Sequence, residues 1–220
     1  MKKNRADLHT HSILSDGELL PSELSRRAFM LGHWAIAITD HVDFSNMEYV
    51  IEKTLKGTQR LSQFVEIEVI PGVEITHVPP ETIPKLVKKA RKLGAKLIIV
   101  HGETIVEPVE KNTNKMALRS DIDILAHPGL LTYEEMEMAK DNGVFIELTS
   151  RRGHSITNGH IAKLASDLGA KLLVNTDAHS PEDLIDHDIA MNVAMGSGLG
   201  EKEAYEVVVE NPKILLEKII

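Results

Sequence analysis

Short apolar stretches alternate with longer amphipathic stretches along almost the whole chain. Seven apolar stretches are suited to buried β-strands, and they cover residues 6–8, 35–39, 68–73, 96–100, 122–126, 144–148 and 171–175. Several are apolar at nearly every position, which is typical of strands in a parallel sheet that is covered on both faces. The pattern therefore predicts repeated β-strand and α-helix units.

The amphipathic segments between these strands predict helices, most clearly over residues 21–31, 81–93, 133–142 and 160–168. A glycine follows each of the four helices and permits the left-handed backbone with which many helices end. Residues 196–200 are typical of a turn before a C-terminal helical segment. No proline-rich or low-complexity linker interrupts the pattern, so we expect one domain over residues 1–220.

Histidines or carboxylates follow six of the predicted strands. The candidate metal ligands are His9, His11, Asp16, His41, Glu74, His101, His127, Asp177 and His179. A lone histidine is more often a surface or hydrogen-bonded residue, but recurrence at strand ends has no such explanation. A parallel α/β barrel brings these ends together where barrel enzymes have their active sites. The residues therefore predict one polynuclear metal site at the carboxyl ends of the strands.

Composition restricts the chemistry further. The chain has no cysteine, which excludes disulfides and thiolate ligands and leaves nitrogen and oxygen donors for a metal. Its formal net charge of −8 argues against general affinity for nucleic acid backbones. The N-terminal residues contain no apolar signal-peptide core and no run approaches membrane-spanning length, so we expect a cytoplasmic protein.

The motifs resemble those of the polymerase and histidinol phosphatase (PHP) family of metal-dependent phosphoesterases. They are, in order, DLHTH at 7–11, SDG at 15–17, TDH at 39–41, GVE at 72–74, His101, AHP at 126–128 and TDAH at 176–179. The resemblance spans nearly the whole chain. It implies a distorted TIM-like barrel of seven βα units, which agrees with the strand count. It also implies up to three divalent ions of zinc, manganese or iron.

The resemblance assigns the ligands to three ions. His9, His11, Glu74 and Asp177 would hold the first ion, and Glu74 would bridge to a second ion that is also held by His101 and His127. Asp16, His41 and His179 would hold the third. Some relatives have histidine where Asp16 stands, and the oxygen ligand favours manganese or iron there. The implied activity is hydrolysis of a small phosphomonoester by metal-activated hydroxide.

Substrate contacts are expected from the segment after the sixth strand. Arg151 and Arg152 follow this strand, and guanidinium groups suit phosphate oxygens, although the two arginines also fit an exposed surface pair. His154 borders a polar loop that would cover the site. Glu147 lies on the strand itself and either belongs to the packing or orients a ligand histidine.

Two further segments remain open. His77 precedes two prolines and fits either the rim of the pocket or, by preference, an ordinary helix entry. Residues 103–115 form a long polar connection that is expected to face the substrate.

The leading function is a phosphatase for a small phosphorylated metabolite such as histidinol phosphate or a nucleotide. An oligonucleotide-trimming nuclease is an alternative, but the few aromatic residues offer little surface for stacking bases. The motifs also allow a non-catalytic metal-binding regulatory module or a hydrolase of C–N or C–O bonds. We expect no extended nucleic acid and no membrane as partners, and the sequence leaves the oligomeric state open.

Overall fold

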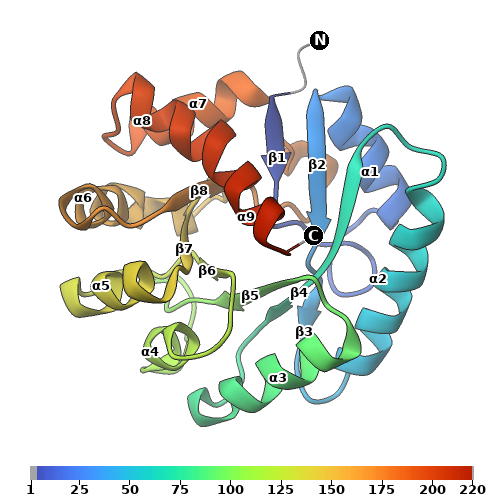
Figure 1. Cartoon of the computed structure of the whole chain (residues 1–220), viewed down its shortest axis with the longest axis horizontal. Helices are drawn as coiled ribbons and strands as arrows, with labels where there is room; N and C mark the ends of the chain where they lie inside the picture. The colour runs from blue at the N-terminus through green and yellow to red at the C-terminus, as the bar shows by residue number, and fades with distance from the viewer. Residues whose placement is uncertain (1–3, 220) are drawn as a thin grey trace.

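A computed structural model describes residues 4–219 and shows a parallel sheet curled into a nearly closed barrel (Figure 1). Seven strands lie in the order β1 (Arg5–Asp7), β2 (His33–Ile38), β4 (Glu68–Ile75), β5 (Leu97–His101), β6 (Ile124–Ala126), β7 (Phe145–Thr149) and β8 (Leu172–Asn175). The two-residue strand β3 (His41–Val42) pairs with β4. The predicted TIM-like fold of seven βα units is confirmed, and each predicted strand end moves by two residues at most.

The barrel closes between β8 and β1 at its carboxyl end. The Asp177 backbone N–H donates to the His9 carbonyl over 2.9 Å, and the His11 N–H donates to the Ala178 carbonyl over 2.8 Å. At the start of β1, the Arg5 guanidinium also reaches β8 and donates to the carbonyl of Val174 over 3.3 Å. The segments that complete the barrel are therefore the same segments that carry four of the predicted ligands.

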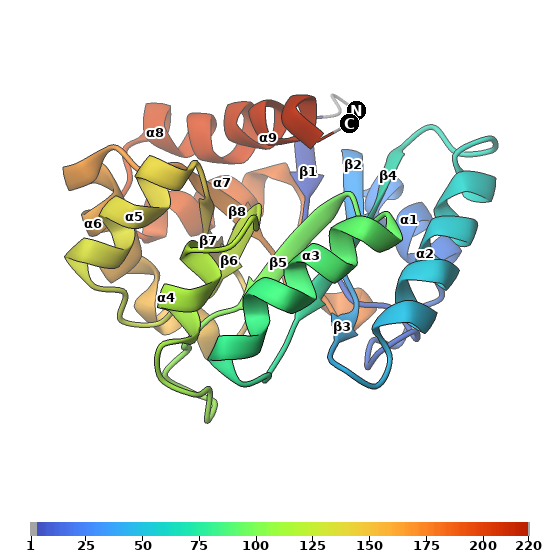
Figure 2. The ribbon, with the colours of Figure 1, turned by 60° about the horizontal axis from the view of Figure 1, so that its bottom comes forward.

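Helices cover the outside of the barrel (Figure 1). The four predicted helices are confirmed as α1 (Pro21–Met30), α3 (Ile83–Leu93), α5 (Tyr133–Asn142) and α6 (Asn158–Leu168). The glycine after each has a positive φ, between 67° at Gly143 and 104° at Gly94. The predicted C-terminal helical segment comprises α8 (Glu201–Tyr205), a π-helical stretch (Glu206–Glu210) and α9 (Asn211–Ile219), which lie along one end of the barrel (Figure 2).

Three helices were not predicted: α2 (Met47–Leu61), α4 (Thr113–Leu118) and α7 (His187–Gly196). The buried face of α2 includes Thr54 and Thr58, and that of α4 includes Thr113 and Asn114, so polar residues interrupt the apolar periodicity. The expected connection over residues 103–115 is consequently shorter, because α4 begins at Thr113.

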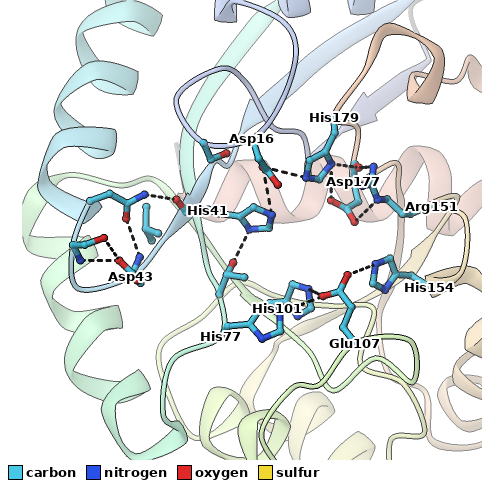
Figure 3. Close-up of a pocket in the computed structure, with 15 residues that line it drawn as sticks. Asp16, His41, Asp43, His77, His101, Glu107, Arg151, His154, Asp177 and His179 are labelled. Carbon is cyan, nitrogen blue, oxygen red and sulfur yellow. Dashed lines mark hydrogen bonds and ion pairs between the residues drawn. The ribbon is translucent and has the colours of Figure 1, made fainter.

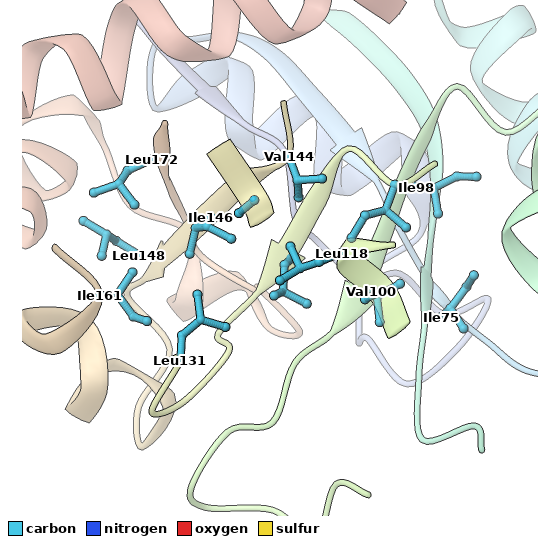
Figure 4. Packing of buried hydrophobic residues seen from close by; sticks show 14 of the residues in the cluster. Ile75, Ile98, Val100, Leu118, Leu131, Val144, Ile146, Leu148, Ile161 and Leu172 are labelled. Carbon is cyan, nitrogen blue, oxygen red and sulfur yellow. The ribbon is translucent and has the colours of Figure 1, made fainter. Parts of the chain in front are cut away.

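Alternating strand residues divide the core into two layers. On β5, Leu97 and Ile99 point into the barrel, where they join an apolar cluster that includes Leu215 of α9. Ile98 and Val100 point outward and pack in the layer between the strands and the surrounding helices (Figure 4). Both faces of the sheet are covered, and the ligand-bearing strand ends are fixed by packing on both sides.

Within residues 4–219, no helix combines the length and the apolar character needed to cross a membrane.

Candidate metal centre

The structure brings all nine predicted ligand residues together at the carboxyl end of the barrel. They fall into four overlapping groups, and within each group the ligand atoms lie within 4.8 Å of one another: His11, Asp16, His41 and His179; His9, His127 and Asp177; His9, His11 and Glu74; Glu74, His101 and His127. Because the groups share members, they form one continuous cluster. Its inner members are buried, whereas Asp16 is exposed and His41 and His179 are partly exposed.

Many donor atoms of this cluster are buried without a hydrogen-bond partner. They include both ring nitrogens of His11 and His127, both carboxylate oxygens of Glu74, His9 Nε2 and Asp177 Oδ1. Native structures leave few buried polar atoms unsatisfied, since each costs the free energy of its lost hydration. Divalent ions would satisfy these lone pairs, so the residues fit a multinuclear metal centre.

The second nitrogen of several imidazoles supports this interpretation. His9 Nδ1 lies 2.7 Å from Glu147 Oε2, and His179 Nδ1 lies 2.9 Å from the Asp177 carbonyl oxygen. These oxygens accept hydrogen bonds, so each Nδ1 carries the proton and each Nε2 of the neutral ring presents a lone pair. The lone pair of His9 faces Glu74 Oε2 at 3.2 Å. Two acceptors in contact need an extra proton or a cation between them, and metal-binding histidines are oriented in this way.

Glu147 therefore has the orienting position that the sequence left open. Its carboxylate is buried, and besides the contact to His9 it accepts a hydrogen bond from Asn175 Nδ2 over 3.0 Å. The amide oxygen of Asn175 in turn accepts from the Leu8 N–H over 3.0 Å. This network connects β7 and β8 to the start of the ligand segment on β1, so the three elements position His9 together.

Two of the predicted ligands have a strained backbone. His127 has a φ of 26° and Asp177 a φ of 53°, in the left-handed region that non-glycine residues seldom adopt. Asp177 is held there by its neighbours: the Thr176 hydroxyl donates to Asp7 Oδ2 over 2.7 Å, and Arg151 Nη1 donates to the Asp177 carbonyl over 3.1 Å. Such strain is typical of functional sites whose surroundings fix the conformation.

Asp40 folds the loop that carries Asp16. Its buried carboxylate accepts hydrogen bonds from the Ser12 N–H and hydroxyl, each over 2.7 Å, and from the Ser15 hydroxyl over 2.8 Å. Gly17 allows the loop to turn, because a Cβ at this position would lie 2.3 Å from the His11 carbonyl oxygen. As a result, Asp16 Oδ1 lies 3.3 Å from His179 Nε2 and 3.7 Å from His41 Nε2.

Burial shifts the proton affinities of the inner ligands. It raises the pKa of the Asp177 carboxyl to about 7, because ionisation away from water is costly. Burial and the neighbouring histidines lower the pKa of His11 and of His127 well below the usual value. The raised pKa of Asp177 and the lowered pKa values of His11 and His127 both favour the uncharged form of the buried side chain. Bound cations would instead favour ionised carboxylates and neutral imidazoles.

A cavity of about 480 Å³ opens over the cluster (Figure 3). Of the three residues predicted to contact substrate, Arg151 and His154 line this cavity, whereas Arg152 is exposed and is not part of the lining. Arg151 Nε lies 3.5 Å from Asp177 Oδ2. The His154 ring stacks on His127 with a centroid separation of 4.3 Å.

Glu107 was not predicted as a site residue. It lies within the long connection after β5, and its carboxylate reaches His77, His101 and His154 in the cavity. Its only sequence signal was its place in a segment expected to face the substrate. His77 also lines the cavity, so the rim interpretation of this residue is confirmed.

Comparison with known proteins agrees with this geometry. The family sequence model described as the PHP domain matches residues 7–118, which include six of the nine cluster residues. The chain belongs to the PHP family. The recognition made from its motifs is therefore confirmed.

An uncharacterized protein of Methanocaldococcus jannaschii is 54% identical over 98% of the chain and 100% of its own length. A probable phosphatase of Caldanaerobacter subterraneus subsp. tengcongensis is 30% identical and covers 96% of this PHP chain and 91% of its own length. Among solved structures, archaeal ribonuclease P contains a similar chain with a TM-score of 0.67 and 17% identity, covering 96% of this chain and 89% of that one. At this identity the structural likeness shows a shared fold.

Proposed function

We propose that this PHP protein is a metal-dependent phosphatase that hydrolyses small phosphomonoesters. The observation that carries the proposal is the cluster of nitrogen and oxygen donors, buried and unsatisfied, at the floor of an open cavity. Membership of the PHP family and the likeness to a probable phosphatase support it.

Three ions would be held as the family resemblance implies. The first would take His9, His11, Glu74 and Asp177, the second Glu74, His101 and His127, and the third Asp16, His41 and His179. When bound, zinc, manganese or iron at these positions would lower the pKa of a water molecule, orient the ester and stabilise charge on the phosphoryl oxygens.

Glu74 has the geometry of a bridging residue. Its Oε2 lies 3.2 Å from His9 Nε2, while its Oε1 lies 3.7 Å from His127 Nε2. The two oxygens thus face histidines assigned to different ions. The backbone of Glu74 is fixed by β4, and its N–H donates to the Asp40 carbonyl over 3.2 Å. The fixed backbone of Glu74 therefore sets the distance between the donors of the first and the second proposed ion.

Arg151 would bind the phosphate. Its guanidinium lines the cavity and contacts Asp177 and Asp183, and its remaining N–H donors are available to phosphate oxygens. Asp177 contributes to this arrangement because its carboxylate keeps the guanidinium beside the proposed ligands. The cavity volume falls within the range of roughly 300–1,000 Å³ that is common for sites of small ligands.

A nuclease that trims oligonucleotides is the second candidate. One observation favours it: Phe44 is 54% exposed and lies between Asp43 and Ser45, which both line the cavity. An exposed phenyl ring at this position would give a nucleobase a surface for stacking. The phosphomonoesterase remains the better supported function, because a single exposed ring is little surface for a polynucleotide.

Phosphate release tests the proposal. Purified protein is supplied with manganese, zinc or iron and incubated with a panel of phosphorylated metabolites, nucleotides and short oligonucleotides, with a chelator as control. We expect metal-dependent release from a small monoester, and loss of that activity in Glu74→Gln but not in Glu68→Gln, which changes an exposed glutamate of the same strand. Preferential shortening of oligonucleotides would support the nuclease. Absence of release from every substrate would contradict both functions.

A further inference from the structure

Glu107 joins three segments of the cavity wall through one carboxylate (Figure 3). Its Oε2 lies 3.1 Å from His101 Nε2 and 3.2 Å from His77 Nε2, and its Oε1 lies 3.3 Å from His154 Nε2. His101 ends β5, His77 follows β4 and His154 follows β7. The nine ligands assigned through the family resemblance include His101 but neither Glu107 nor His77. The assignment therefore does not explain why these side chains meet.

His101 is arranged like His9: its Nδ1 faces an acceptor oxygen, and its Nε2 faces a carboxylate. His101 Nδ1 lies 3.1 Å from the Gly102 carbonyl oxygen, which can only accept, so the proton of a neutral ring is on Nδ1. The Nε2 lone pair then faces the Glu107 carboxylate. Two acceptors at this distance need either an extra proton or a cation between them.

The spacing suits a shared cation. Ligand atoms at about 2.0–2.2 Å from a divalent ion lie about 2.8–3.1 Å apart at octahedral angles and about 3.3–3.6 Å apart at tetrahedral angles. The contact of 3.1 Å between His101 and Glu107 falls in the octahedral range. The ligand atoms of His77, His101 and Glu107 lie within 4.8 Å of one another, as do those of Glu74, His101 and His127. His101 belongs to both groups, and its Nε2 can bind one ion only.

We propose that Glu107 is a further ligand of the ion held by His101, and that His77 orients Glu107 by donating a hydrogen bond to it. The ion is a divalent cation that accepts nitrogen and oxygen donors. The proposal rests on the metal centre of the proposed function but not on the phosphatase reaction. If Glu107 is a ligand, a bound ion would also hold the loop between β5 and α4 against the metal centre.

The base of this loop is built to hold Glu107 in place. Asn114 Oδ1 accepts from the Glu103 N–H over 2.9 Å, and Asn114 Nδ2 donates to the Pro128 carbonyl over 2.9 Å. The Thr104 hydroxyl lies 2.7 Å from His154 Nδ1. Glu107 therefore projects from a fixed base, and the outer residue Ile105 is 52% exposed. Such support is what a precisely placed ligand requires.

Metal binding in Glu107→Gln tests the proposal. The number of bound ions and their affinities are measured with manganese and a competing chelator in the wild type, in this variant and in Glu110→Gln, which neutralises an exposed glutamate of the same loop. We expect one ion to bind about 10-fold more weakly, or worse, in Glu107→Gln, with all affinities retained in the control. The absorption spectrum of bound cobalt should also change only in Glu107→Gln. Equal affinities and spectra in all three proteins would overturn the proposal, as would loss of an additional fourth ion.

Limited proteolysis of the loop separates a ligand from a structural support. If Glu107 is a ligand, manganese protects residues 105–110 from cleavage in the wild type and in Glu110→Gln, but not in Glu107→Gln. His77→Asn should lose part of the protection, since it removes only the orienting hydrogen bond. Cleavage that rises equally in the metal-free and metal-loaded forms of Glu107→Gln would indicate a structural support and would overturn the proposal.

Discussion

Hydrogen bonds to the outer nitrogens of the imidazoles determine what the centre can bind. The Nδ1 atoms of His9 and His179 are each committed to an acceptor oxygen, which leaves Nε2 to bind a cation. Glu147, placed on β7, would thus influence a metal that it does not touch. The chemistry of the centre depends on these outer partners as much as on the ligands themselves.

The adjacent arginines provide a matched test of phosphate binding. Arg151 lines the cavity and Arg152 does not, so Arg151→Lys should raise the KM for a phosphomonoester while Arg152→Lys leaves it unchanged. Loss of the forked, charge-assisted contact is worth roughly 1.5–3 kcal/mol, or about 10- to 100-fold in KM. Steady-state kinetics on both variants decide the question, and equal KM values would contradict the assigned role of Arg151.

The convergence of the candidate ligands was predictable, whereas the place of Glu107 in the cavity was not. His9 and His11 lie at a spacing of two at the end of an apolar stretch, and that position identifies them from the sequence alone. Glu107 lies six residues beyond the end of β5, in a segment without periodicity. Its path toward His101 depends on Asn114 and other loop contacts, which no local pattern encodes.

At the scale of elements, the loop after β1 is shaped by close backbone packing. Gly17 lies against the carbonyl of His11, while Asp40 holds the serines of the loop. The loop places Asp16 opposite His41 and His179, which belong to different strand ends. The proposed third ion position would therefore depend on the conformation of this one loop.

Gly17→Ala should weaken the third ion position selectively, because the added Cβ would lie 2.3 Å from a backbone oxygen and must displace the loop. Gly57→Ala is the matched control, since a Cβ in α2 meets nothing within 4 Å. The control should keep its metal content and gain about 0.5–1 kcal/mol in the free energy of unfolding. Elemental analysis and urea unfolding measure the two effects. Full metal content in Gly17→Ala would contradict the role given to the loop.

Strands were easier to predict than helices in this chain. The strands are apolar on both faces, and their signal is strong even over three to five residues. The buried faces of α2 and α4 contain threonine and asparagine, and the Asn114 side chain is held by tertiary hydrogen bonds such as the one it donates to the Pro128 carbonyl. Those bonds become visible only when the barrel is assembled.

At the scale of the whole molecule, the segments that close the barrel also carry residues of the candidate centre. The His9 and Asp177 segments close the barrel through their backbones and supply ligands through their side chains. Metal binding should consequently stabilise the fold, since ions that bind only the native state add to its free energy of unfolding.

His33 adds a pH dependence at the opposite end of the barrel. Burial and the charge of Arg5 lower its pKa from 6.5 to about 4. As the pH falls below 6.5, the unfolded chain binds the proton first, so stability is lost progressively until about pH 4. His33→Gln should remove roughly 3 kcal/mol of the loss between pH 7 and pH 4. Urea unfolding of the metal-free proteins provides the measurement, and parallel pH curves for both would contradict the assignment.

The most direct test of the account is the number of divalent ions bound per chain in the wild type and in Glu74→Gln. We predict three ions in the wild type after loading with manganese or zinc. The variant should retain at most the ion of Asp16, His41 and His179, because both inner ions lose their shared carboxylate while the packed barrel stays folded. A wild type that binds no ions, or a variant that binds as many as the wild type with the same affinity, would contradict a metal centre bridged by Glu74.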